Sequence, residues 1–185
     1  MGKLIMVTGG ARSGKSTFAE KKAGEIGQNV LYVATSIPLD EEMKLRIEKH
    51  REQRPVCWET LEAYRDMDIH LPDMLEGRSA VLLDCITIMV CNLMFDIHTE
   101  WDRVSRDDIL ETEYRVVDQV KKLLSVAEAS EVPFIVVTNE LGMGIVPDNK
   151  LTRVYRDIAG RVNQMLAGAA HEVYFCVSGI PVKIK

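Results

Sequence analysis

The chain has 185 residues and a mass of 20.9 kDa, with 46% hydrophobic and 28% charged residues. This size and composition predict a single globular domain over residues 1–185, whose core needs no disulfide or structural metal. The formal net charge is −5, which argues against a protein that binds bulk DNA or RNA, because such binding needs a basic surface.

Short apolar runs alternate with longer amphipathic segments along the chain. Runs such as AVLLD and FIVVT are apolar throughout, which is typical of parallel strands covered by helices on both faces. The pattern predicts a three-layer α/β fold with a mostly parallel sheet and a C-terminal hairpin, and ligands bind such sheets at the carboxyl ends of the strands. We expect strands at 3–8, 29–34, 58–61, 80–84, 133–138, 172–177 and 182–184, and helices at 15–26, 40–53, 63–75, 87–95, 107–130 and 149–169.

A phosphate-binding loop follows the first predicted strand. Glycines let backbone N–H groups approach phosphate oxygens, and the helix that follows adds a partial positive charge. In such a loop the lysine reaches the β- and γ-phosphates and the final hydroxyl holds Mg²⁺. The alternative is an ordinary glycine-rich turn, which the flanking strand and helix disfavour. The loop matches GxxxxGK[ST] in full, with Gly9, Gly10, Ala11, Arg12, Ser13, Gly14, Lys15 and Ser16.

An acidic residue at a strand end completes the expected magnesium site. Asp84 follows four apolar residues and should stand at the carboxyl end of its strand, beside the loop if the two strands are neighbours. Asp84 would then hold the Mg²⁺ together with Ser16, directly or through water. The alternative is that Asp84 caps the next helix. GTP and ATP are both candidate substrates, since spacing does not choose between them and the Asn-Lys-x-Asp guanine motif is absent.

A histidine lies among arginines in the segment 40–55. At about 100° per residue, Arg46, His50 and Arg54 form one stripe of a helix. One interpretation is a nucleophilic imidazole flanked by guanidinium groups that bind phosphates. The alternative, which spacing alone favours, is a helix whose basic residues complement its C-terminus.

The remaining composition bears on metals and location. Four cysteines and four histidines are scattered without a CxxC pair, which argues against zinc or iron–sulfur ligation. No stretch approaches the 18 apolar residues of a membrane span. We therefore expect a cytoplasmic protein with reduced thiols.

Several blocks together resemble one known family. The phosphate loop 9–16, Ala34-Thr35-Ser36, the segment 46–51, the block 138–147 (TNELGMGIVP), the block 156–164 and the segment 177–180 resemble the bifunctional adenosylcobinamide kinase / adenosylcobinamide-phosphate guanylyltransferases of cobalamin biosynthesis. The resemblance implies a RecA-like P-loop fold, often a homotrimer, and a corrinoid substrate. It also implies two reactions, phosphorylation of adenosylcobinamide by a nucleoside triphosphate and transfer of GMP from GTP through a guanylylated histidine.

The resemblance also assigns site residues. The histidine nucleophile falls on His50, against the interpretation that spacing alone favours. Some members carry two adjacent histidines, whereas this chain has Lys49 at the first position. The nucleotide contacts fall on the loop 9–16, on Ala34, Thr35 and Ser36, on Arg51, Glu52, Gln53 and Arg54, and on Glu62 and Asp84.

Two other functions are compatible with parts of the pattern. A monofunctional P-loop kinase of a small metabolite would use Lys15 and Asp84 and leave His50 without a role. A nucleotide-dependent switch would bind nucleotide without group transfer, although the missing guanine motif argues against it.

Overall fold

The computed structural model describes residues 2–37 and 55–185. The predicted helix at 40–53 lies outside these residues, as do His50, Arg51, Glu52, Gln53 and Arg54. Their predicted roles therefore have no structural counterpart here.

Seven strands form one sheet in the order β3-β2-β4-β5-β1-β6-β7. All neighbouring pairs are parallel except β6 and β7, which form an antiparallel hairpin. The predicted mostly parallel sheet with a C-terminal hairpin is thus confirmed. The strands are β1 (Leu4–Gly9), β2 (Val30–Ala34), β3 (Glu59–Glu62), β4 (Ala80–Asp84), β5 (Phe134–Asn139), β6 (Glu172–Val177) and β7 (Ile180–Lys183).

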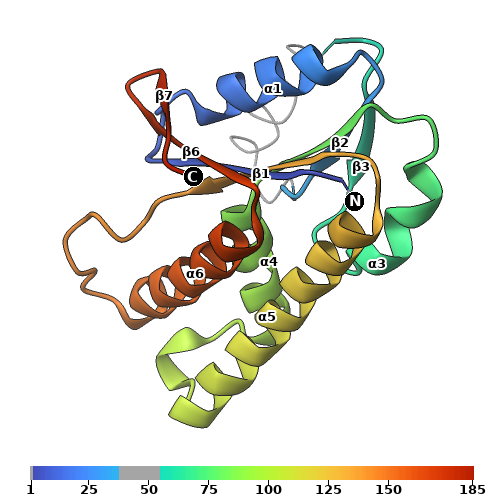
Figure 1. Ribbon diagram of the computed structural model, residues 1–185. Coiled ribbons are helices and arrows are strands. Elements are labelled where there is room, and N and C mark those ends of the chain that lie inside the picture. The colour runs from blue at the N-terminus through green and yellow to red at the C-terminus, as the bar shows by residue number, and fades with distance from the viewer. Residues whose placement is uncertain (1, 38–54) are drawn as a thin grey trace.

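Helices cover both faces of the sheet, which confirms the predicted three layers (Figure 1). Helix α1 packs on one face and α4, α5 and α6 lie on the other. Side chains cap two of these helices, since Ser105 and Asn149 accept hydrogen bonds from the first turns of α5 and α6. The helices are α1 (Lys15–Ile26), α3 (Met67–His70), α4 (Ile86–Ile97), α5 (Arg106–Ala129) and α6 (Lys150–Ala169), with 3-10 turns at Pro72–Met74 and Trp101–Arg103.

The predicted helix at 63–75 is wrong as one element. Its first residues stay extended or bent, and Asp66 adopts a left-handed conformation with φ of 51°. The α-helix is confined to α3, and the 3-10 turn begins at Pro72. Proline has no N–H to donate to the preceding turn, so it starts a new turn here and does not continue the helix.

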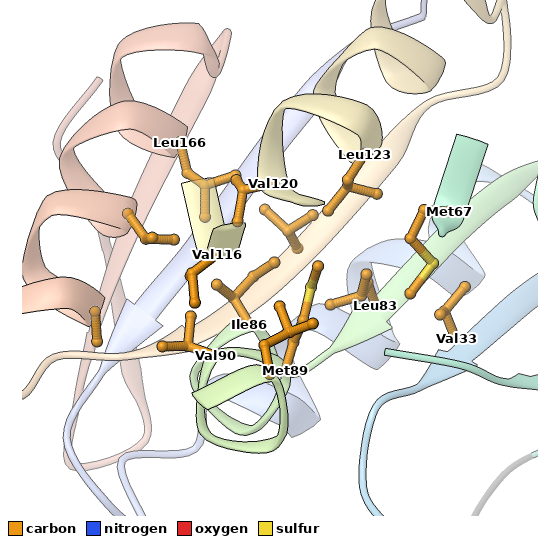
Figure 2. Close-up of a cluster of buried hydrophobic side chains, with 14 of the residues drawn as sticks. Val33, Met67, Leu83, Ile86, Met89, Val90, Val116, Val120, Leu123 and Leu166 are labelled. Atoms are coloured by element: carbon orange, nitrogen blue, oxygen red, sulfur yellow. The ribbon is translucent and has the colours of Figure 1, made fainter. Parts of the chain in front are cut away.

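The larger hydrophobic core lies between the sheet and α4, α5 and α6. Val116 and Val120 of α5 meet Ile86 and Val90 of α4 there, and Leu166 of α6 joins them (Figure 2). The smaller core lies under α1, whose Ala19 and Ala23 are fully buried against the sheet. Small alanines let α1 approach the sheet closely, and α1 carries the phosphate loop at its start.

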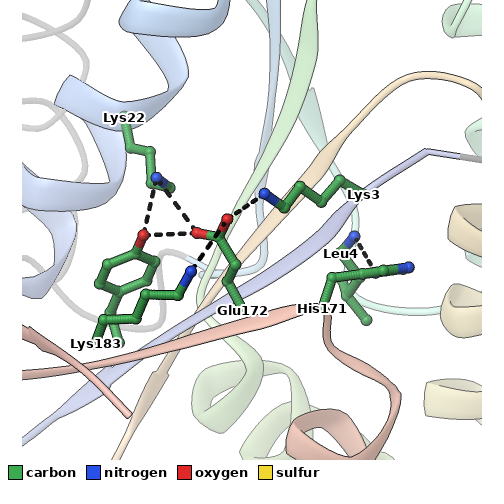
Figure 3. Close-up of polar contacts among 7 residues, drawn as sticks. Lys3, Leu4, Lys22, His171, Glu172 and Lys183 are labelled. Atoms are coloured by element: carbon green, nitrogen blue, oxygen red, sulfur yellow. Dashed lines mark hydrogen bonds and ion pairs between the residues drawn. The ribbon is translucent and has the colours of Figure 1, made fainter. Parts of the chain in front are cut away.

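A carboxylate ties β6 to the elements around it. Glu172, at the start of β6, contacts the ammonium groups of Lys3, Lys22 and Lys183 and accepts a hydrogen bond from the Tyr174 hydroxyl (Figure 3). Lys3 immediately precedes β1, Lys22 lies in α1, and Lys183 ends β7. The contacts therefore hold the hairpin against both α1 and the start of β1.

Within 2–37 and 55–185, no helix is long and apolar enough to cross a membrane.

Candidate active site

The sheet brings most of the predicted nucleotide-binding residues to one edge. In the strand register, Ala34 at the end of β2 pairs with both Asp84 and Glu62. Gly9 at the end of β1 pairs with Asn139 of β5 and with Cys176 of β6. These are the carboxyl ends of parallel strands, where ligands bind in open α/β sheets.

The phosphate loop connects β1 to α1 and is held in place by the hairpin turn. Gly14 adopts φ of +85°, and a Cβ there would stand 2.9 Å from the Cα of Gly179. The Gly179 N–H donates to the Ser13 carbonyl at 2.9 Å. Glycine at position 14 is therefore required both by its left-handed backbone and by the close turn.

The loop has the polar groups that a phosphate needs. Lys15 is 9% exposed, and its ammonium donates to the Gly10 carbonyl at 3.2 Å, which folds the side chain back over the loop. The hydroxyl oxygens of Thr8 and Ser13 are buried and have no hydrogen-bond partner among residues 2–37 and 55–185. Since buried hydroxyls are normally paired, these two fit a site whose partners come from a bound anion.

Asp84 ends β4, but β4 is not the neighbour of β1. Strand β5 lies between them, so one strand separates Asp84 from the strand that leads into the phosphate loop. The alternative of a helix cap is wrong, because Cys85 is the N-cap of α4 and Asp84 remains in the strand.

The pKa of the buried Cys85 thiol is affected by burial and by the charges of Asp84 and Lys15. Burial raises the pKa of Cys85 to about 11, the Asp84 carboxylate adds to the rise, and the Lys15 ammonium opposes it.

The donor set fits a magnesium–triphosphate complex. Ser16, at the first turn of α1, and Asp84 offer a hydroxyl and a carboxylate, and Mg²⁺ prefers such oxygen ligands. No group of three or more His, Cys, Asp or Glu side chains that could hold a metal occurs in residues 2–37 and 55–185. Magnesium bound with a nucleotide does not need such a group, since one or two protein oxygens, the phosphates and several waters complete its octahedral shell.

The other predicted contacts have different surroundings. Ser36 is partly exposed just past β2, and Glu62 is exposed at the end of β3, one of the two edge strands. Thr35 is only 1% exposed. Its hydroxyl donates a hydrogen bond to the Cys85 carbonyl at 2.8 Å and accepts one from the Cys85 N–H at 2.9 Å. The Thr35 hydroxyl is thus already paired inside the protein.

Sequence reasoning missed a set of polar side chains beneath this edge. Asn139 donates to the Thr87 hydroxyl at 2.7 Å, and Asn163 donates to the Asn139 carbonyl at 2.9 Å. Asn163 also accepts a hydrogen bond from Thr138 at 2.7 Å. The sequence feature that could have indicated these polar contacts is the polar pair Thr138-Asn139 at the end of an apolar strand.

Comparison with known proteins identifies the family. The family model described as cobinamide kinase / cobinamide phosphate guanyltransferase matches residues 5–184. The chain belongs to this cobinamide kinase / cobinamide phosphate guanyltransferase family. The match covers every described strand except the first residue of β1.

Full-length relatives agree with this assignment. The bifunctional adenosylcobalamin biosynthesis protein CobU of Salmonella typhimurium is 49% identical over 98% of this chain and 99% of that protein. The protein of the same name from Escherichia coli is 46% identical over the same shares. The CobP protein of Pseudomonas aeruginosa is 36% identical over 97% of this chain and 96% of its own.

Among solved structures, the RadB recombinase is similar over 94% of this chain and 73% of its own, with a TM-score of 0.47 and 18% identity.

Proposed function

We propose that the carboxyl edge of the sheet holds the triphosphate for both reactions of this cobinamide kinase / cobinamide phosphate guanyltransferase. The observation that carries the proposal is the gathering of the phosphate loop and Asp84 at that edge. The buried hydroxyls of Ser13 in the loop and of Thr8 just before it have no partner within the described residues. GTP and ATP are the proposed nucleotide substrates, and the corrinoid is adenosylcobinamide.

In the kinase step, the loop residues orient the triphosphate through their backbone N–H groups and the Lys15 ammonium. Ser16 and Asp84 would hold Mg²⁺, which when bound neutralises charge on the β- and γ-phosphates. The aminopropanol hydroxyl of the corrinoid attacks the γ-phosphorus as the bond to the β-phosphate oxygen breaks. We also include Ala34, Ser36 and Glu62 among the nucleotide contacts. Ala34 ends β2 and pairs with Asp84, Ser36 lies just past that strand end, and Glu62 ends β3 on the other side of β2.

In the guanylyltransferase step, His50 acts as the nucleophile. A neutral imidazole nitrogen attacks the α-phosphorus of GTP, a nitrogen–phosphorus bond forms, and pyrophosphate leaves. An oxygen of the corrinoid phosphate then attacks the same phosphorus and releases the imidazole. Arg51 and Arg54 would bind the phosphates, with Glu52 and Gln53 nearby in sequence.

Labelling with GTP tests this assignment directly. Protein incubated with GTP labelled at the α-phosphorus should retain label that is lost in acid and stable in alkali, whereas label at the γ-phosphorus should not be retained. His50→Ala should abolish retention, and His70→Ala, at an exposed residue of α3, is the matched control.

The outcomes separate the competing functions. Label on a residue other than His50 would refute the assignment of the nucleophile. Kinase turnover without retained label would favour the monofunctional kinase, and nucleotide binding without turnover of GTP and cobinamide would favour the switch.

We further propose a cytoplasmic homotrimer. Large apolar side chains are exposed on the loop after β5 and on the hairpin, among them Met143, Ile145, Ile180 and Ile184. Exposed apolar groups in this number support contact between subunits. Light scattering should give about three times the 20.9 kDa chain mass, and a value near one chain mass at micromolar concentration would reject the trimer.

A further inference from the structure

Every polar group of Thr35 is engaged inside the protein. Its N–H donates to the Asp84 carbonyl at 3.4 Å, and its hydroxyl both donates to and accepts from the backbone of Cys85. Its carbonyl accepts a hydrogen bond from the Asn92 side chain at 2.7 Å. Thr35 therefore joins the end of β2 to Asp84, the last residue of β4, and to Cys85, the N-cap of α4.

The same contacts continue into the next strand. The Cys85 thiol lies 3.3 Å from the Thr87 hydroxyl, which accepts the hydrogen bond from Asn139 at the end of β5. Thr35, Cys85, Thr87 and Asn92 are all at most 7% exposed. A continuous buried polar network thus links β2, β4 and β5 just beneath the edge where the triphosphate is expected.

Buried networks whose members are all paired fix local geometry, because breaking one bond leaves groups that water does not reach. At the end of β4, Thr35 bonds to the backbone of Asp84 and Cys85 and not to the Asp84 side chain, which leaves the carboxylate itself available for the site. We propose that Thr35 is a positioning residue. Its hydroxyl fixes the backbone that carries Asp84 and does not contact the nucleotide, and Asn92 holds Thr35 in place through its carbonyl.

This inference rests on the proposed role of Asp84 in holding Mg²⁺. It predicts that loss of the Thr35 hydroxyl weakens the effect of Mg²⁺ on nucleotide binding, and leaves binding without Mg²⁺ unchanged. A hydroxyl that touched the nucleotide would give the opposite result, because its loss would weaken binding under both conditions.

The test uses calorimetry with the α,β-methylene analogue of GTP, which cannot release pyrophosphate, in the absence of corrinoid. The dissociation constant is measured in excess EDTA and over a series of Mg²⁺ concentrations. Thr35→Val keeps the shape of the side chain and removes both hydroxyl bonds. Thr35→Ser keeps the hydroxyl and should restore wild-type behaviour.

For Thr35→Val, we expect an unchanged affinity in EDTA and an enhancement by Mg²⁺ that falls about five- to tenfold, within the usual range of coupling between two sites. In an Asp84→Asn background the same substitution should have no further effect on the enhancement, because two residues that act through one group are not additive. Thr112→Val is the matched control, since Thr112 is fully buried in α5 and bonds only within that helix in the described structure.

The outcomes distinguish this inference from the function on which it rests. An Asp84→Asn protein with full Mg²⁺ enhancement would overturn the role of Asp84, and the inference with it. A reduced enhancement in Asp84→Asn together with wild-type values in Thr35→Val would overturn the inference alone, as would equal weakening with and without Mg²⁺. If thermal melting shows that Thr35→Val does not fold, Asn92→Ala replaces it, with an expected loss of enhancement of about twofold.

Discussion

The N–H of Gly179 donates to the carbonyl of Ser13 at 2.9 Å, so a hairpin turn late in the chain supports the phosphate loop near its start. Ser178 and Gly179 both have positive φ, of 51° and 83°, as a two-residue hairpin turn of type I′ requires. The turn stands so close to Gly14 that no side chain fits between them.

Gly14→Ala should therefore destabilise the loop and reduce kinase activity. The new Cβ would stand 2.9 Å from the backbone of Gly179 and force alanine into a left-handed conformation, at a cost of at least about 1 kcal/mol. Gly24→Ala is the control, because Gly24 lies in α1 with open space around it and alanine should stabilise the helix by about 0.5–1 kcal/mol. Urea unfolding and kinase assays check both, and equal behaviour of the two variants would contradict the proposed crowding.

Lys15→Ala should weaken triphosphate binding by about 10- to 100-fold and remove kinase activity, since a charged hydrogen bond contributes about 1.5–3 kcal/mol. Its control is Lys21→Ala, whose side chain is 75% exposed in the same helix and pairs with Glu25 at 4.0 Å. Calorimetric titration with nucleotide separates the two variants. Wild-type turnover in Lys15→Ala would remove this residue from the site.

Glu172→Gln should destabilise the protein in a pH-dependent way. Hydrogen bonds from Lys3 and Tyr174 lower the pKa of Glu172 to about 2. Because the folded-state pKa lies below the usual value near 4.5, the stabilisation is complete above about pH 4.5 and is lost as the pH falls toward 2. Lys3 and Lys183 are half exposed, so solvent screening limits the expected loss at pH 7 to about 1–2 kcal/mol.

Urea unfolding at pH 7 and at pH 3 checks this expectation. The difference between Glu172→Gln and wild type should shrink at the lower pH. Glu25→Gln, whose side chain is 63% exposed, should match wild type at both values. A difference that stays constant with pH would mean that the Glu172 carboxylate stabilises the hairpin by shape and not by charge.

One cysteine should react quickly with a thiol reagent in the native protein. Cys57 is exposed, whereas burial raises the pKa of the Cys85, Cys91 and Cys176 thiols. A low thiolate fraction and poor access both slow the reaction. At pH 8 we expect one fast equivalent that Cys57→Ser removes, and four equivalents after unfolding. A fast phase that survives Cys57→Ser would show that a buried thiol becomes accessible.

The layers of the fold followed from the sequence because apolar strands and amphipathic helices have different periods. The order of the strands did not, since pairing partners far apart in the chain leave no local signal. For this reason Asp84 was placed at the correct edge, while the intervening β5 was not foreseen. The helix predicted at 63–75 failed because its apolar spacing was helical although Pro72 interrupts the backbone hydrogen bonds.

For the candidate site, the motif 9–16 was the strongest signal because its glycines and lysine are tied to one backbone geometry. Thr35 shows the limit of that reasoning. Its position beside the site was predictable, but the direction of its hydroxyl depends on Cys85, which follows a different strand. The network of Thr87, Asn139 and Asn163 is distributed over three segments, so no short motif announces it.

The place of β1 between β5 and β6 has a consequence for synthesis on the ribosome. Leu4 pairs with Phe134, and Ile5 pairs with Glu172. Strand β1 emerges first from the ribosome, but it cannot pair with its neighbours until β5 and β6 have been synthesised. The support of Ser13 by Gly179 also forms only then. Such long-range pairing is slow to form. A nascent chain that ends before residue 172 therefore lacks both β6 and the turn that braces the loop, and should not retain nucleotide until the hairpin has been made.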